Sequence, residues 1–258
     1  MKITRKDFLK ILGGSAVAAT AGTLARSAAS AEPNAATNKA AEPKAAVKRW
    51  GMVIDTSKCR ESGCDDCIRA CRVAHNIPQI PNPKQEIKWI WKEPFENVFP
   101  MQQTDYTRQA FKTPLTVLCN HCADPGCVRV CPTKATWKRE DDGIVMMDYH
   151  RCIGCRYCMA GCPYGSRSFN FVDPRPYVAE INPEYPTRTK GVVEKCNFCE
   201  ERLAVGKQPA CVEACRDKAL VFGDLNDENS GIRQVLRERF AVQRKPELGF
   251  GPAVFYLL

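Results

Sequence analysis

The sequence predicts an α+β fold built as an internal repeat, and three observations support this prediction. The 258 residues include sixteen cysteines, which fall into four groups of four with none left over. Short runs of β-type composition stand beside these groups, so that a cysteine loop, a short strand, a turn and the next cysteine loop recur along the chain. A helical pattern follows the last group, in residues 230–240.

The cysteine groups share a terminal C-x3-C step and differ in the gaps before it. The third group, "CIGCRYCMAGCP" at residues 152–163, reads C-x2-C-x2-C-x3-C-P, and the second reads C-x2-C-x4-C-x3-C-P. The first reads C-x4-C-x2-C-x3-C and the fourth C-x2-C-x11-C-x3-C, and in these two Arg72 and Arg216 stand where the proline would be. In chain order the groups are Cys59, Cys64, Cys67 and Cys71; Cys119, Cys122, Cys127 and Cys131; Cys152, Cys155, Cys158 and Cys162; and Cys196, Cys199, Cys211 and Cys215.

The third pattern is that of bacterial ferredoxins, in which three thiolates of a run hold one iron–sulfur cluster and the fourth reaches a neighbouring cluster. Each run therefore needs a partner run. We predict nested bacterial-ferredoxin-like domains with loop-rich insertions, in which the middle two groups build one two-cluster unit and the outer two build a second unit around it. The expected ligand sets of the four [4Fe–4S] clusters are Cys59, Cys64, Cys67 and Cys215; Cys196, Cys199, Cys211 and Cys71; Cys119, Cys122, Cys127 and Cys162; and Cys152, Cys155, Cys158 and Cys131.

Three other uses of the cysteines compete with this prediction. Disulfides suit an exported chain, but thiols two residues apart chelate more readily than they bridge distant segments. Structural zinc uses C-x2-C pairs, but each group here carries a third and a fourth cysteine in the ferredoxin order. Free core cysteines do not explain four regular groups.

The formal charge of +9 would favour a nucleic-acid partner, but that count treats every cysteine as neutral. A four-thiolate cluster site carries about −2, so four sites would bring the chain without its first 31 residues to about −3. The surplus lysines and arginines are then expected to be counter-charges for buried clusters.

The first 31 residues have the pattern of a targeting segment. A charged start, "MKITRKDFLK", precedes an apolar stretch and the small residues Ala29-Ser30-Ala31, which predict cleavage before Glu32. The expected organisation is a signal peptide at 1–31, a flexible linker at 32–48 and an iron–sulfur domain at 49–258, with an inner unit at 115–172, an outer unit at 50–75 plus 190–225, and a C-terminal helix and tail at 226–258.

Local patterns predict individual elements of the iron–sulfur domain. Short strands are expected within 50–59 and 218–225, and an Asp-Gly turn indicates a β-hairpin over 135–152. The apolar end at 249–258 is either a last strand or a contact with a partner. In the C-terminal helix, a packing face is predicted from Ile232, Val235, Leu236 and Phe240, with Asn229 or Ser230 as N-cap.

The remaining polar and aromatic residues give no catalytic constellation. His121 lies inside the second cysteine loop and is expected beside a cluster rather than as a ligand. His75 and His150 are expected to have structural or solvent-exposed roles. Trp89, Trp91, Phe95 and Phe99 in the insertion at 72–118 are expected in the core or at an interface.

Four segments of the sequence resemble a known family. The segments "CNHCADPGCVRVCPTKATWKREDDGIV", "CIGCRYCMAGCPYGSRSFNF", "PTRTKGVVEKCNFC" and "FGDLNDENS" resemble the four-cluster iron–sulfur subunits of membrane respiratory complexes, of the NrfC, PsrB and DmsB type. Within that family they are most similar to the DsrO type, the ferredoxin-like subunit of Dsr membrane complexes. The stretch "TRKDFLK" resembles a twin-arginine (Tat) export signal, with Lys6 where a second arginine is usual.

The resemblance implies an electron-transfer subunit with four [4Fe–4S] clusters and no catalytic site of its own. It also implies an NrfD-like multispanning, quinone-interacting membrane partner, a multihaem cytochrome c partner, and a place on the periplasmic side of the cytoplasmic membrane after folded export. One alternative is the electron subunit of a molybdopterin oxidoreductase such as a tetrathionate or polysulfide reductase. The alternative from another class is a zinc- or disulfide-stabilised binding module without a redox role.

Overall fold

The computed structural model describes residues 47–59 and 64–258. The chain divides into two units, Met1–Pro43 and Lys44–Leu258, and every described residue belongs to the second. The predicted signal peptide at 1–31 and the predicted linker, except its last two residues, lie outside the described residues.

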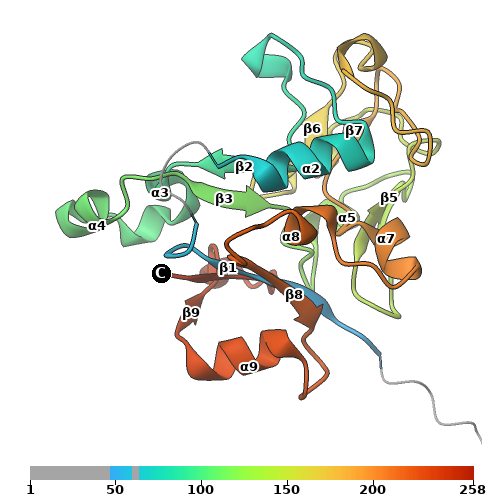
Figure 1. Cartoon of the computed structure of the whole chain (residues 1–258). Coiled ribbons are helices and arrows are strands. Elements are labelled where there is room, and N and C mark those ends of the chain that lie inside the picture. The colour runs from blue at the N-terminus through green and yellow to red at the C-terminus, as the bar shows by residue number, and fades with distance from the viewer. Residues whose placement is uncertain (1–46, 60–63) are drawn as a thin grey trace, which may run out of the picture. The chain divides into compact units, whose positions relative to one another are not determined.

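A four-stranded sheet joins the two ends of the described chain (Figure 1). Its strand order is β8 (Leu220–Asp224), β1 (Trp50–Asp55), β10 (Val254–Leu257) and β9 (Ala241–Val242). The central strand β1 pairs antiparallel with β8, where Met52 faces Phe222, and parallel with β10, where Met52 faces Val254. The predictions of strands within 50–59 and 218–225 are confirmed, and the apolar end of the chain is the expected last strand.

Three two-stranded antiparallel sheets carry the middle of the chain. The predicted hairpin is present as β4 (Thr136–Lys138) and β5 (Val145–Met147), and Gly143 supplies a positive φ of 72° in the connection between them. The first insertion, at 72–118, forms β2 (Ile90–Glu93) with β3 (Leu115–Leu118). The second insertion, at 163–195 between the third and fourth cysteine groups, forms β6 (Ser168–Phe169) with β7 (Val193–Glu194).

The helices of the described residues are short. They are α2 (Asp66–His75), α3 (Phe95–Val98), α4 (Asp105–Ala110), α5 (Gly126–Arg129), α6 (Tyr157–Ala160), α7 (Glu200–Ala204), α8 (Ala210–Glu213) and α9 (Gly231–Glu238), with 3-10 turns η1 (Pro83–Gln85), η2 (Pro100–Gln102), η3 (Arg175–Tyr177) and η4 (Pro246–Leu248). Within this part of the chain, none of them has the length and apolar character needed to cross a bilayer.

Helix α9 packs under β8 and β1, as expected, but its apolar face is narrower than predicted (Figure 1). Ile232 is fully buried against Val53 and Leu257, with Val235 and Leu236 partly buried around them. Phe240 lies beyond the end of the helix and is 84% exposed, so its inclusion in the face was wrong. Ser230 occupies the N-cap position, but its hydroxyl donates to the Asp224 carbonyl, which ties α9 to the end of β8 instead of capping the helix.

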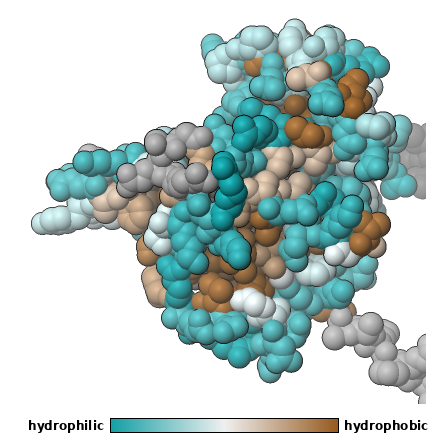
Figure 2. Space-filling model, in the orientation of Figure 1, coloured by the Kyte–Doolittle hydropathy of each residue, from teal (hydrophilic) through white to brown (hydrophobic). Residues whose placement is uncertain are grey.

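The main core is built from the first insertion and the four-stranded sheet. Trp89, Trp91, Phe95 and Phe99 are all buried in it, so the expectation of a core role is confirmed. A separate apolar cluster surrounds Cys127 and Cys158 of the inner cysteine groups. Hydrophilic residues cover most of the face shown in Figure 2, and hydrophobic residues appear between them mainly in its middle.

We predict that Ile232→Ala lowers the free energy of unfolding by about 2–5 kcal/mol, because it leaves a cavity between α9 and the sheet. The measurement is the midpoint of thermal unfolding of the cofactor-loaded protein. The matched control, Phe240→Ala, removes a larger but exposed side chain and is expected to change stability by less than about 0.5 kcal/mol. An equal loss in both variants would contradict the burial pattern.

Candidate metal centres

All sixteen cysteines lie in the described residues and are free thiols. The disulfide alternative therefore does not describe this structure. The thiols gather into separate sites, which we call site A to site D.

Site A brings together Cys59, Cys64, Cys67 and Cys215. Burial and, after it, the charges of the neighbouring Cys59, Cys215 and Cys64 together raise the pKa of Cys67 to about 12. Burial likewise raises the pKa of Cys59, with Cys215 and Cys64 again among its neighbours. Cys59 follows β1, Cys67 is in the first turn of α2, and Cys215 follows α8.

Site B brings together Cys71, Cys196, Cys199 and Cys211. Burial raises the pKa of Cys71 well above its ordinary value, and the charges of the other three thiols add to this effect. Cys71 lies four residues after Cys67, so both point from one face of α2. Helix α8 packs on α2, carries Cys211, and leads into Cys215 of site A.

Site C brings together Cys119, Cys122, Cys127 and Cys162. Burial raises the pKa of Cys122, and the charges of Cys119, Cys162 and Cys127 raise it further. Cys127 lies in α5, and Cys162 follows α6, which packs on α5. The structure thus places one thiol of the third sequence group with three of the second.

Site D contains Cys152 and Cys158. Burial raises the pKa of Cys158, Arg167 opposes this rise, and the charges of Cys127 and Cys152 add to it. Burial alone would raise the pKa of Cys131, but the backbone of Thr136 and the hydroxyl of Thr133 hydrogen-bond its sulfur and lower the pKa below its ordinary value. Cys155 is exposed. That Cys131 and Cys155 complete site D stays a prediction from the sequence spacing.

The four sites follow one another in space. Burial is the main reason for the high pKa of Cys211, and Cys67 of site A is among the thiols that add to it. Burial and, next in size, the charge of Cys119 of site C raise the pKa of Cys196 to about 12. The charge of Cys127 of site C is also among the causes that raise the pKa of Cys158 of site D, where burial is the largest cause. The spatial order is therefore A, B, C, D, although site A uses both the first and the last cysteine of the chain.

Sets of four thiols fit a [4Fe–4S] cluster, and so do the hydrogen-bond donors around them. The backbone N–H groups of Ala210 and Ala219 lie 3.4 and 3.3 Å from the sulfurs of Cys199 and Cys215. The guanidinium of Arg167 lies 3.0 Å from the sulfur of Cys127. Donors of this kind stabilise thiolates and tune iron–sulfur clusters.

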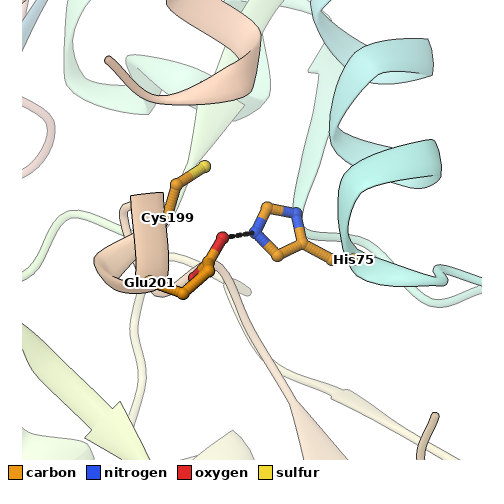
Figure 3. Close-up of side chains that lie close together, drawn as sticks. All are labelled: His75, Cys199 and Glu201. Atoms are coloured by element: carbon orange, nitrogen blue, oxygen red, sulfur yellow. Dashed lines mark hydrogen bonds and ion pairs between the residues drawn. The ribbon is translucent and has the colours of Figure 1, made fainter. Parts of the chain in front are cut away.

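His75 joins site B to a nearby carboxylate (Figure 3). His75 is fully buried in α2, with Nδ1 3.0 Å from the Cys71 carbonyl and 3.6 Å from its sulfur, and Nε2 3.0 Å from Glu201 Oε1. Burial alone would raise the pKa of Glu201, but the hydrogen bond and charge of His75 hold it below its ordinary value.

His75, Glu201 and Cys199 offer three possible metal-ligating atoms within 4.8 Å of one another. Cys199 already lies among the thiols of site B, and His75 and Glu201 bind each other. We therefore interpret the pair as support for Cys71 and not as a second metal site. The expectation of a structural role for His75 is confirmed by these contacts.

His121 has a different role, between sites B and C. Its ring is fully buried and stacks on Phe198, with centroids 3.7 Å apart, and its Nδ1 accepts the backbone N–H of Val145 at 3.0 Å. Burial lowers the pKa of His121 well below its ordinary value, so the ring is neutral. His150 is exposed.

The sequence reasoning did not single out the buried cations. Arg167 and Lys195 are 4% and 1% exposed and lie at the thiol sites, and Arg188 forms a fully buried ion pair with Glu194 at 2.8 Å. The available signal was their position, since Arg167 follows Cys162 by five residues and Lys195 directly precedes Cys196. The general expectation of counter-charges pointed to such residues without naming them.

Comparison with known proteins identifies the class to which these sites belong. Residues 112–176 and 175–225 each match the family model described as a 4Fe-4S dicluster domain. The fold is therefore α+β and ferredoxin-like, and the match supports 4Fe-4S clusters as the cofactor of this chain.

Curated relatives then identify the family. The chain is 43% identical over 230 residues to the Hdr-like menaquinol oxidoreductase iron-sulfur subunit 1 of Archaeoglobus fulgidus, covering 81% of this chain and 83% of that protein. It is 36% identical to the menaquinone reductase iron-sulfur cluster-binding subunit of Nitratidesulfovibrio vulgaris, covering 81% and 88%. It is 38% identical to the protein NrfC of Escherichia coli, covering 80% and 79%. The chain belongs to the NrfC/PsrB-type iron–sulfur subunit family.

We predict that cluster retention falls as the pH falls. The raised pKa values of Cys67 and Cys196 mean that these thiols hold protons at neutral pH when no iron is bound. Iron binds the thiolate, so protons compete with it, and acid favours loss of the metal. Iron content after treatment with a chelator should be lower at about pH 6 than at about pH 8. Retention that does not change between these pH values would contradict the prediction.

Proposed function

We propose that the chain is the electron-transfer subunit of a membrane-associated respiratory complex and holds four [4Fe–4S] clusters. The observation that carries this proposal is the order of the thiol sites, in which each site adjoins the next. Bound at these sites, each cluster supplies one reversible one-electron centre. The chain's own residues hold the sites close together, keep water away from sites B and C, and surround their sulfurs with hydrogen-bond donors.

Both ends of the row of sites support contact with redox partners. At site D, Cys155 is exposed, and its neighbours Ile153 and Tyr157 are 67% and 62% exposed. At site A, Cys59 lines a pocket of about 260 Å³ together with Phe111 and Leu115. A relay needs one surface that receives electrons and one that passes them on.

The proposed ligand sets are the nested ones predicted from the sequence, with Cys215 completing site A, Cys71 site B, Cys162 site C and Cys131 site D. All sixteen cysteines are then ligands, so no thiol is left for covalent catalysis. The proposed domains are likewise the predicted ones: a Tat-type signal peptide at 1–31, a linker at 32–48 and the iron–sulfur domain at 49–258.

The proposed partners are an NrfD-like, quinone-interacting membrane subunit and a multihaem cytochrome c subunit, in a Dsr-type complex of dissimilatory sulfur metabolism on the periplasmic side of the membrane. The relatives named for menaquinol and menaquinone support a quinone-linked complex. A relative from Salmonella typhimurium that is named for tetrathionate reductase favours a second candidate, the electron subunit of a molybdopterin oxidoreductase.

Native purification of the complex tests this function. We expect a brown protein with absorption near about 400 nm, from iron–sulfur charge transfer. A multispanning membrane protein and a haem c protein should co-purify with it. A large molybdopterin subunit in their place would establish the second candidate, and a colourless zinc protein would overturn both.

Nested ligand pairing predicts a non-additive loss of iron. Cys67→Ser should remove one cluster, about four iron atoms per chain. Cys67→Ser combined with Cys215→Ser should remove no more, because both changes fall in site A. The matched double variant, Cys67→Ser with Cys71→Ser, should remove about eight iron atoms, because it damages sites A and B. Iron and sulfide counts after anaerobic purification measure this. The reverse result for the two double variants would show that each sequence group binds its own cluster.

A further inference from the structure

Two buried cations, Arg167 and Lys195, lie near the thiols of site C. Arg167 donates through Nη2 to the sulfur of Cys127 at 3.0 Å and to the hydroxyl of Thr136 at 2.9 Å. That hydroxyl donates in turn to the Met146 carbonyl at 2.7 Å, so the hairpin β4–β5 fixes the guanidinium in place. Arg167 also lies near Cys158 of site D.

The second cation, Lys195, lies near the thiols of both site B and site C. Its ammonium donates to the Cys196 carbonyl at 2.5 Å and lies near Cys119 and Cys127 of site C as well as Cys196 of site B. Site D therefore lies near Arg167 alone and site B near Lys195 alone, whereas site C lies near both cations.

A third cation, Arg49, contacts the loop of site C. It donates to the His121 carbonyl at 2.6 Å and to the Gly143 carbonyl at 2.8 Å, and it lies near Cys122. Asp142 is also close to Arg49 and offsets part of its charge. Arg167 and Lys195 therefore supply most of the positive charge near site C.

Acidic groups stand near sites A and B. At site A, the sulfur of Cys64 lies 3.9 Å from Asp66, whose carboxylate also pairs with Arg216 at 2.7 Å. At site B, Glu201 hydrogen-bonds His75 and Asn197. Carboxylates beside a site disfavour additional negative charge, and buried cations favour it.

We infer that site C takes up an electron before the other three sites, because Arg167 and Lys195 both stabilise the added negative charge there. This inference rests on the proposed function. The step adds one electron, supplied by a neighbouring reduced centre or a redox mediator, and no bond forms or breaks. Arginine keeps its charge at all working pH values, and in this low-dielectric interior a fixed charge acts strongly on its neighbours.

A potentiometric EPR titration of the complete, cluster-loaded protein tests the inference. The variants are Arg167→Gln and Lys195→Gln. The control is Arg175→Gln, which removes an exposed guanidinium paired with Asp173. The wild-type signal that appears first on reduction should move to lower potential in both test variants. Its ratio of reduced to oxidised form at a fixed potential should fall at least tenfold, which corresponds to about 59 mV for a one-electron couple.

The conservative variant separates charge from structure. Arg167→Lys keeps the charge and should keep the first signal close to its wild-type potential. If Arg167→Gln loses iron from site C, Arg49→Gln takes its place and should lower the same signal that Lys195→Gln lowers.

Three results overturn the inference while leaving the proposed function intact. The two test variants shift two different signals, or the signal that they share is not the first to appear, or Arg175→Gln shifts it equally. A wild-type protein without any iron–sulfur signal overturns the proposed function as well.

Discussion

The arrangement of the thiol sites depends on cysteines that lie beside the thiols of a distant sequence group and not beside those of their own group. Helix α2 places Cys67 at site A and, one turn later, Cys71 at site B. The segment of helix α8 also contributes to both sites, because α8 carries Cys211 of site B and leads to Cys215 of site A. Two sites with exchanged thiols fix the position of these helices on one another. The segments around residues 70 and 213 must therefore lie together, and the pairing of β1 with β8 brings them there.

Burying so many thiols disfavours the thiolate form that binds iron. Burial raises the pKa of most of these thiols and would hold them neutral, while Arg167, Lys195 and Arg49 bring positive charge into the same interior. Thiolate-bound clusters reverse this balance, because they supply the negative charge that these cations face. Binding of the clusters is then part of the folding free energy, as it is in small metal-binding domains.

The sequence predicted the features that depend on residues close together in the chain or on the chemistry of a motif. The cysteine runs, the hairpin at β4–β5, the strands β1 and β8 and the position of α9 all follow from spacing, turn residues or apolar periodicity. Contacts between distant segments were not predictable in this way. Nothing in the pattern of residues 249–258 says that β10 lies between β1 and β9. The exposure of Phe240 depends on where α9 ends. The position of Lys195 near two sites depends on the packing that brings Cys119 close to Cys196.

The two insertions, which look like loops in the sequence, brace the metal sites. Trp89 of the first insertion and Asn170 of the second both donate to Glu194, which is paired with Arg188. Arg188 also donates to the carbonyls of His75 and Asn76, where α2 ends. A fully buried ion pair with this many partners is costly to break, because either charge alone would be left without compensation. The end of α2 is therefore held rigidly, and with it Cys71 and His75. The insertions thus fix the position of a site B thiol without contributing any cysteine to the site.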